Sequence, residues 1–339
     1  MVKKIGIVSL SSGILGESFI SHELKIGKER LNKYGIEVEF LPNALKGVDF
    51  IKNNPKSRAD DLLTAFKDNS IDMILCAIGG DDTYRLLPYL FENNELKNTV
   101  KQKIFLGFSD TTMNHFMLNK VGIKTFYGQA FLPDVCELSD EMLPYTKKYF
   151  EELITTGKIK EVRPSNVWYQ EREDFSENAV GTDMEKHINT GFELLSGKPI
   201  FEGKILGGCL ESIYDMFDNS GAVDTVSVCN KYNLLPKLDD WKNKILLLET
   251  SEEKPNPNLF KKMINAIKRY GIFDVLSGVL VGKPQNETYY DEYRKILLEE
   301  ISNKDLSVVY NLNIGHATPR CIIPFGVDTE VDIDKQVII

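Results

Sequence analysis

The sequence predicts an α/β fold in which a mostly parallel sheet is covered by helices on both faces. Apolar, β-branched runs alternate with helix-like segments over the first 130 residues, and a second alternating series follows residue 200. The length of 339 residues suits two domains. We expect an N-terminal domain over 1–156, a linker and substrate loop over 157–200, and a C-terminal domain over 201–339.

Strands and helices are predicted in turn along the first half. Compact apolar runs predict strands at 4–10, 37–41, 71–78, 103–108 and 123–128. Helical spacing predicts helices at 18–33, 57–66, 83–94, 111–122 and 140–156. Ser57 followed by Asp60 has the pattern of a capping box, which places a helix start at Ser57. Pro88 is expected to kink the helix that contains it.

The second half has its own alternating pattern. Strands are predicted at 244–249, 275–282 and 307–315, and helices at 207–219, 257–270 and 289–301. The helix after Asn256 has proline in its first turn and Gly271 beyond its end, the usual asymmetry of helix termini. Residues 157–200 are polar and aperiodic, so we expect a linker with an exposed loop around Trp168.

Composition and charge exclude several classes of partner. The net charge is −9 and the pI is about 5.2, which argues against a nucleic-acid groove and against docking on anionic lipid. The cysteines are odd in number and far apart, without a CxxC pair, and therefore predict reduced, mostly buried thiols: Cys76, Cys136, Cys209, Cys229 and Cys321. We expect no disulfide framework and no zinc knuckle.

The N-terminus reads as a first strand rather than a targeting signal. Two lysines precede an apolar run of about six residues, which is shorter than a signal-peptide core and lacks an A-x-A site. No stretch approaches the ~18 apolar residues that span a bilayer. We therefore expect a cytoplasmic enzyme with no membrane partner.

Histidine is the scarce residue that a metal-free hydrolase needs as a base. The chain has four histidines, and three of them fall in predicted helices or in the linker: His22, His115 and His187. His316 alone follows an apolar strand directly, in NIGHATP. Loops at the carboxyl ends of strands build the active sites of open α/β sheets, so His316 is the candidate base, although a lone histidine is often structural.

Ser109 is the candidate nucleophile. In KIFLGFSDTT it stands between a strand and a helix, which is the position of a nucleophile elbow. The helix start also supplies free N–H groups and a positive potential for an oxyanion. The motif is not G-x-S-x-G, and a plain helix cap by Ser109 explains the same letters.

Two further elements would complete such a site. The Asp110 N–H and the Gly79–Gly80 turn are candidate oxyanion donors, because glycine allows close backbone approach. Glu249 ends the strand KILLLE and could orient the histidine, with Glu252 and Glu253 as rivals.

These segments coincide in one known pattern, and the chain resembles the LD-carboxypeptidase family of serine peptidases. The resemblance covers almost the whole chain in six ordered segments: SRADDLLTAFKDNSIDMILCAIGGDDTYRLLPYL, GFSDTT, TFYGQ, GKILGGCLESI, LLLETSEE and NIGHATPRCIIPFGV. It implies Ser109 as nucleophile, Glu249 as orienting acid and His316 as base, spread over two domains. It also implies a Rossmann-like N-terminal domain, a barrel-like C-terminal sheet and a homodimer.

Two branches of the family compete. One trims the terminal D-amino acid from murein tetrapeptides; the other resembles the microcin C immunity carboxypeptidase, which cuts between an aminoacyl group and a nucleotide. Asp81-Asp82 after Gly-Gly, Cys209 where murein enzymes have asparagine, and Trp168 as a ring that could stack on a base favour the second branch. The expected substrate is therefore a small peptide or peptidyl-nucleotide, with Asp81, Asp82 and Trp168 as candidate binding residues.

The predicted chemistry is acyl transfer to Ser109 followed by hydrolysis, without a metal or organic cofactor. A nucleotide- or NAD-dependent enzyme is an alternative, but no G-x-G-x-x-G follows the first strand. A non-catalytic protein that sequesters its ligand is a further alternative.

Overall fold

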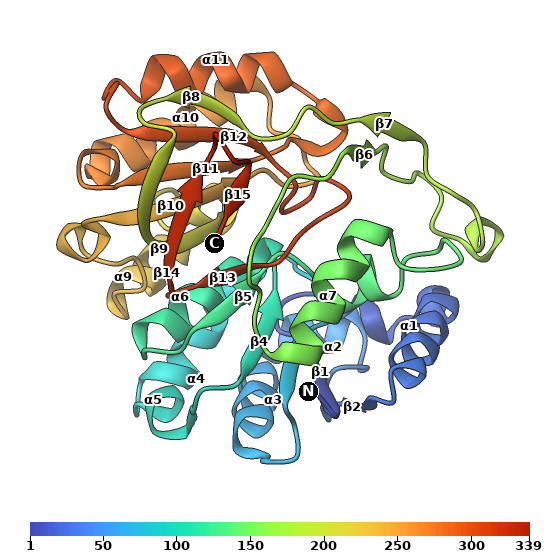
Figure 1. The fold of residues 1–339 in the computed structure, drawn as a ribbon. Coiled ribbons are helices and arrows are strands. Elements are labelled where there is room, and N and C mark those ends of the chain that lie inside the picture. Colours follow the sequence, from blue (N-terminus) through green and yellow to red (C-terminus); the bar gives the residue numbers. More distant parts are fainter.

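The computed structural model describes all residues, 1–339, and contains two main sheets, one in each half of the molecule (Figure 1). The first sheet has the strand order β13-β5-β4-β3-β1-β2. Its strands are β1 (Lys4–Val8), β2 (Glu37–Phe40), β3 (Met73–Cys76), β4 (Ile104–Gly107), β5 (Thr125–Tyr127) and β13 (Ile323–Phe325). The first five are parallel, as the sequence predicts, and β13 pairs antiparallel with β5.

Helices cover the first sheet on both sides (Figure 1). They are α1 (Ser21–Lys33), α2 (Val48–Asn53), α3 (Pro55–Lys67), α4 (Leu87–Phe91), α5 (Glu95–Thr99), α6 (Thr112–Lys120) and α7 (Pro144–Thr156). The prediction of a Rossmann-like α/β layer is confirmed.

The second sheet is a curled half-barrel with the order β15-β14-β9-β10-β11-β12-β8. Its strands are β8 (Glu193–Ser196), β9 (Ile200–Cys209), β10 (Lys244–Glu249), β11 (Gly278–Gly282), β12 (Ser307–Leu312), β14 (Asp328–Asp332) and β15 (Val337–Ile338). Strands β9 to β12 are parallel, and β8 and β14 are antiparallel edges of that group. The accompanying helices are α8 (Leu210–Tyr214), α9 (Thr225–Lys231), α10 (Pro257–Tyr270) and α11 (Tyr290–Glu300). The predicted barrel-like sheet is confirmed.

Several element boundaries differ from the prediction. Helix α3 begins at Pro55 rather than at Ser57, because the fixed φ of proline suits a first turn, and no side chain caps the helix. Pro88 likewise lies in the first turn of α4, after a 3₁₀ turn at Thr83–Leu86, so the predicted kink within a longer helix is not present. The helix predicted over 207–219 shortens to α8 because Gly207 and Gly208 extend β9. A Cβ on Gly207 would lie 2.0 Å from Leu247 O, so only glycine allows this close pairing with β10.

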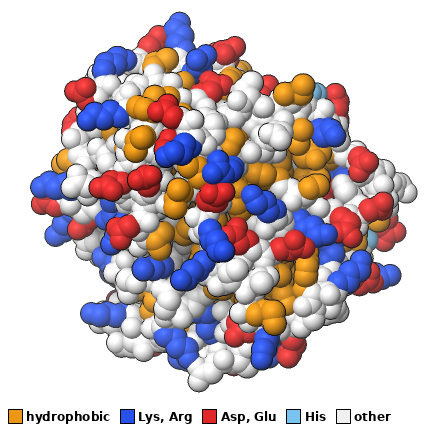
Figure 2. Space-filling model, in the orientation of Figure 1, with side chains coloured by type: hydrophobic (Ala, Val, Ile, Leu, Met, Phe, Trp, Pro, Cys, Tyr) orange, Lys and Arg blue, Asp and Glu red, His pale blue; other side chains and the backbone are white.

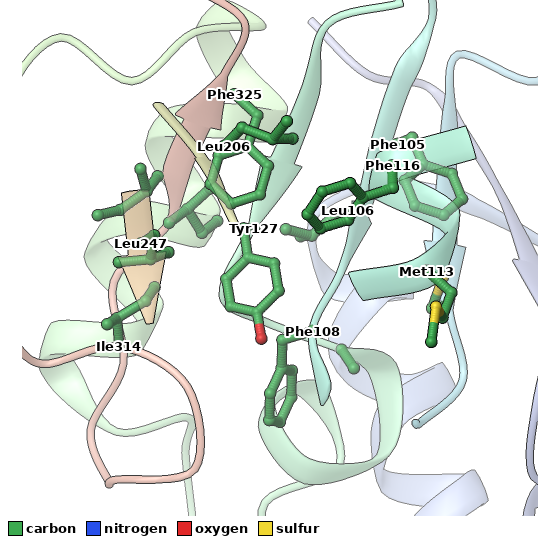
Figure 3. Packing of buried hydrophobic residues seen from close by; sticks show 14 of the residues in the cluster. Phe105, Leu106, Phe108, Met113, Phe116, Tyr127, Leu206, Leu247, Ile314 and Phe325 are labelled. Atoms are coloured by element: carbon green, nitrogen blue, oxygen red, sulfur yellow. The ribbon is translucent and has the colours of Figure 1, made fainter. Parts of the chain in front are cut away.

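The predicted linker is partly structured, and the chain crosses back between the sheets. The linker holds β8 and a separate hairpin of β6 (Val167–Tyr169) and β7 (Lys186–Ile188). Strand β13 comes from the C-terminal half but belongs to the first sheet. One continuous cluster of 85 buried residues joins the two halves, and Figure 3 shows its middle, where Tyr127 and Leu247 approach from opposite sheets.

The surface carries both signs of charge. Lys/Arg and Asp/Glu side chains alternate over the face drawn in Figure 2, without a large area of one sign. All five cysteines are free and buried, as predicted. None of the helices has both the length and the apolar character that crossing a membrane requires.

Candidate active site

Ser109 stands on a strained turn between β4 and α6. Its φ of +64° lies in the left-handed region, which is unfavourable for a residue with a side chain and typical of a nucleophile elbow. A 3₁₀ turn over Ser109–Thr111 then leads into α6. Gly79 makes room for this turn, since a Cβ there would lie 2.5 Å from Ser109 Cβ and 2.6 Å from Ser109 Oγ.

The structure brings the three predicted catalytic residues together. His316 Nε2 lies 3.1 Å from Ser109 Oγ, and His316 Nδ1 lies 2.7 Å from Glu249 Oε2. The His316 backbone N–H donates to the same carboxylate oxygen at 3.1 Å. Gly315 has a φ of +77°, and a Cβ there would lie 2.2 Å from Glu249 Oε2, so glycine is required beside the histidine.

Two carboxylates face the imidazole from opposite sides. Glu249 contacts Nδ1, while Glu252 Oε2 lies 3.0 Å from Nε2. Burial disfavours the charged imidazole, but the two carboxylates outweigh it and raise the pKa of His316 to about 10. The same contact lowers the pKa of Glu252 to about 2. The two acids that the sequence left as alternatives therefore differ in position: Glu249 contacts Nδ1, and Glu252 contacts Nε2, the nitrogen that also faces Ser109.

Neighbouring side chains hold the histidine loop in place. The edge of His316 meets the ring of Phe108 with centroids 5.1 Å apart. Arg320 is buried, pairs with Asp134 at 3.0 Å, and donates to Thr318 Oγ1 within the loop at 3.1 Å. The imidazole is thus fixed by packing and by hydrogen bonds on both sides of the loop.

The candidate oxyanion donors lie beside the serine. Asp110 N is 3.2 Å from the position that a Cβ on Gly79 would occupy, so the elbow and the Gly79–Gly80 turn are adjacent. The buried carboxylate of Asp110 ties these segments together, because it accepts hydrogen bonds from Ser11 Oγ at 2.6 Å and Thr83 N at 2.9 Å. Desolvation raises the pKa of Asp110.

The three predicted substrate-binding residues lie in different surroundings. Asp81 is exposed at the rim of the cleft. Asp82 also lines the cleft, but its carboxylate is paired with the fully buried Arg58 and with Arg85. Trp168 is only 7% exposed on β6, and its ring stacks on His187 with centroids 4.2 Å apart, outside the residues that line the cleft.

The other histidines have roles outside the cleft. His115 is fully buried between Thr125 Oγ1 and the Gly107 carbonyl, and burial lowers its pKa to about 4. His22 Nε2 lies 3.0 Å from the Phe175 carbonyl. His187 packs on Trp168, as described above.

One trio of side chains could be considered for a metal. Ligand atoms of Cys209, Glu249 and His316 lie within 4.8 Å of one another. However, burial raises the pKa of the Cys209 thiol well above its usual range, and His316 Nδ1 is already bonded to Glu249. A protonated thiol is a poor ligand, so these residues suit proton transfer better than metal binding.

Two adjoining hollows meet at Ser109. One, of about 470 Å³, is lined by 17 residues, among them Lys52 as the lone lysine or arginine and seven acidic residues: Asp81, Asp82, Asp110, Glu211, Asp215, Glu252 and Glu253. The other, of about 460 Å³, has apolar side chains, two arginines and three glutamates: Ile14, Ile78, Phe108, Pro133, Phe175, Arg172, Arg320, Glu137, Glu171 and Glu252. Its two arginines are paired with Glu137 and Asp134, so the second hollow differs from the first in its apolar and arginine side chains rather than in lacking carboxylates.

This fold is that of a known family, and the chain belongs to it. Residues 5–128 match the LD-carboxypeptidase N-terminal domain, and residues 202–331 match the LD-carboxypeptidase C-terminal domain. The chain is accordingly a hydrolase of a peptidase family.

Individual relatives refine that assignment. An MccF-like protein of Streptococcus pneumoniae, crystallised with AMP, is 63% identical, with a TM-score of 0.99 and coverage of 100% of this chain and 98% of that chain. The microcin C7 self-immunity protein MccF of Escherichia coli is 24% identical over 322 residues, 91% of this chain and 85% of that protein. A probable murein peptide carboxypeptidase of Bacillus subtilis is 24% identical over 303 residues, 87% of this chain and 80% of that protein. These similarities are consistent with the microcin-immunity-like branch.

Sequence reasoning missed some residues that complete the site. Tyr127, Thr112 and Arg320 contact the predicted residues or their loop, but the sequence assigned them no role, although all three lie in the matched segments TFYGQ, GFSDTT and NIGHATPRCIIPFGV. The sequence indicated Glu252 only as an alternative to Glu249, because it lies three residues beyond Glu249 in the same acidic segment. The sequence offered no way to tell which imidazole nitrogen each acid would face.

Proposed function

We propose that this protein is a serine-type carboxypeptidase or amidase that uses Ser109, His316 and Glu249 as a catalytic triad. The observation that carries the proposal is the unbroken chain of contacts from Ser109 Oγ through His316 to Glu249, at the junction of the two hollows. A serine, a histidine and an acid in this order have the geometry of an activated nucleophile.

Each residue has a defined step in the proposed reaction. His316 Nε2 accepts the Ser109 proton as Oγ attacks the amide carbonyl, and Glu249 stabilises the imidazolium that forms. Backbone N–H groups of Asp110 and the Gly79–Gly80 turn hold the oxyanion, and the loss of one such donor costs about 3–4 kcal/mol. His316 then returns the proton to the leaving nitrogen, and water hydrolyses the acyl-enzyme.

We infer that the substrate is an aminoacyl or peptidyl group joined to a nucleotide. The relative from Streptococcus pneumoniae binds AMP, and MccF has been crystallised with aspartyl sulfamoyl adenosine and with glutamyl sulfamoyl guanosine. The acidic hollow suits the free ammonium group of an aminoacyl moiety. The second hollow, with Phe108, Phe175 and Arg172, suits a nucleoside and its anionic linker.

A murein tetrapeptide is the second candidate, because a probable murein peptide carboxypeptidase is among the relatives. Its D-amino acid leaving group carries a carboxylate, which needs a cationic partner. The acidic hollow offers Lys52 alone for this purpose, and the arginines lie in the other hollow. The nucleotide ligands of the relatives, rather than the charge of either hollow, therefore favour the nucleotide conjugate.

The experiment is a side-by-side hydrolysis assay of aspartyl sulfamoyl adenosine and a murein tetrapeptide. We expect cleavage of the first, loss of turnover in Ser109→Ala, and full activity in Ser227→Ala, a serine on the exposed face of α9. Undiminished turnover by Ser109→Ala would refute the triad. Tight binding of the conjugate without any turnover by the wild type would instead identify a sequestering protein.

A further inference from the structure

Tyr127 is a buried residue that touches two members of the proposed triad. It lies at the end of β5 and is fully buried. Its hydroxyl donates to Glu249 Oε1 at 2.6 Å and accepts a hydrogen bond from the Ser109 backbone N–H at 3.2 Å. Figure 3 shows the ring between Phe325 and Phe108, with the hydroxyl directed away from Phe325.

These contacts close a ring of hydrogen bonds. The path runs from Ser109 Oγ to His316, from His316 to Glu249 Oε2, and from Glu249 Oε1 through Tyr127 back to Ser109 N. Glu249 is thus held at both oxygens. Ser109 is held at its side chain and at its backbone. Ser109 follows β4 of the first sheet and Glu249 ends β10 of the second, so Tyr127 links the two sheets at these residues.

The direction of each hydrogen bond around the phenol is fixed. Ser109 N–H can only donate, and Thr112 Oγ1, at 3.5 Å, accepts from Cys209 N at 2.9 Å and so points its own proton at the phenol. The phenol proton is therefore directed to Glu249. Burial and the Glu249 charge raise the pKa of Tyr127 well above its usual range, so the donor remains protonated.

The ring itself is held by packing on the strand that crosses back. Tyr127 stacks on Phe325 with centroids 5.3 Å apart and planes at 11°. Phe325 belongs to β13, which pairs with β5. The hydroxyl thus has little freedom to leave Glu249, which suits a group that orients a catalytic carboxylate.

We propose that Tyr127 is a positioning residue of this enzyme, which holds the Glu249 carboxylate and the Ser109 elbow in register across the two sheets. The proposal rests on the triad proposed above. The phenol also withdraws part of the Glu249 charge, so it sets how strongly the carboxylate attracts the His316 Nδ1 proton.

The test is Tyr127→Phe, which removes only the hydroxyl. Because hydrogen bonds to charged groups are strong, we expect kcat to fall about ten- to a hundredfold with KM within about twofold. Glu249 then becomes a stronger acceptor, so the far-downfield proton signal of His316 Nδ1–H should move further downfield. Tyr310→Phe is the matched control: Tyr310 is also fully buried and donates to the Tyr290 carbonyl at 3.0 Å, but it lies on β12 away from the triad.

A second measurement keeps the wild-type chain. Incorporation of 3-fluorotyrosine at all 14 tyrosines makes each phenol a stronger donor, and the same His316 signal should then move upfield. The signal is assigned by its loss in His316→Gln. If Tyr127→Phe does not fold, this labelling experiment still tests the proposed role of Tyr127.

The outcomes separate this inference from the proposed function. If Ser109→Ala is inactive but Tyr127→Phe matches Tyr310→Phe in kcat and in the His316 signal, Tyr127 is a packing residue and the inference is wrong. If Ser109→Ala retains turnover, the triad is wrong and the role of Tyr127 falls with it. A lower kcat together with opposite shifts of the signal in the two experiments supports the assignment.

Discussion

Glu252 provides the sharpest test of the electrostatics in the cleft. Its carboxylate lies 3.0 Å from His316 Nε2, the atom that must accept the proton of Ser109. Glu252→Gln removes the charge and keeps the shape of the side chain. We predict that the acid limb of the pH profile of kcat/KM, which reports the free enzyme, moves to lower pH.

The magnitude follows from the groups around the imidazole. Three carboxylates near the imidazole supply negative charge: Glu249, Glu252 and Glu211. The Arg320 guanidinium and the neutral side chains of Cys209 and Tyr127 also lie nearby. The net result is a pKa of His316 of about 10. The coupling is reciprocal, because His316 lowers the pKa of Glu252 from 4.5 to about 2. The Glu252 side chain is 60% exposed, so water screens the pair, and we expect a displacement of about one pH unit.

The lower pKa of His316 in Glu252→Gln affects activity and stability in different ways. The base is active when neutral, so a lower pKa of His316 increases kcat/KM at neutral pH. A folded-state pKa raised above 6.5 contributes stability that is complete below that value and is lost as the pH rises through about 10. Glu252→Gln should therefore be less stable than the wild type at neutral pH, and the two should converge above about pH 10.

The assay measures kcat/KM for aspartyl sulfamoyl adenosine from about pH 6 to 11, with thermal unfolding in parallel over the same range. Glu253→Gln is the matched control, because Glu253 lines the same hollow without a contact to the imidazole. An acid limb that stays in place or moves upward in Glu252→Gln would show that Glu252 does not contact His316 in solution, and the reasoning would fail.

Three further substitutions test other parts of the site. Gly79→Ala should reduce kcat at least tenfold without unfolding the protein, because its Cβ would lie 2.6 Å from Ser109 Oγ; steady-state kinetics and circular dichroism check this. Asp82→Ala should lower the free energy of unfolding by about 3–5 kcal/mol, because it leaves the guanidinium of Arg58 buried without its partner, as urea denaturation can measure. Trp168→Ala should leave KM for the adenosine conjugate unchanged, because the ring is buried on His187 outside the cleft; a raised KM for the adenosine conjugate but not for a murein tetrapeptide would show that the ring reaches a nucleobase.

The elements of the fold that the sequence predicts are those with a local hydrophobic pattern. Strands such as β3 and β10 are short, continuous apolar runs, and this is the signature of a strand buried on both faces. The sequence could also indicate Ser109, Glu249 and His316, because each stands at or just after the carboxyl end of a strand, where α/β sheets assemble their sites.

The rest depends on contacts between residues far apart in the chain. Strand β13 has three residues, too few for a periodic signal, and its pairing with β5 joins residues almost 200 positions apart. The hydroxyl of Tyr127 meets a carboxylate 122 positions away. Trp168 was expected in an exposed loop, but a short hairpin buries it on His187, a pairing that the polar composition of the segment does not reveal.

The way the His316 loop is anchored explains why the three residues of the proposed triad lie within hydrogen-bonding distance. The loop that bears His316 leaves the second sheet at the end of β12 and enters the first sheet at the start of β13, and every residue between them is buried. A loop tied at both ends to different sheets fixes the position of one sheet relative to the other. Ser109 beside the first sheet and Glu249 on the second are therefore both held within hydrogen-bonding distance of His316 by the backbone itself. Neither half of the chain could retain this geometry alone, because the first sheet would lose β13 and, with it, the ring on which Tyr127 stacks.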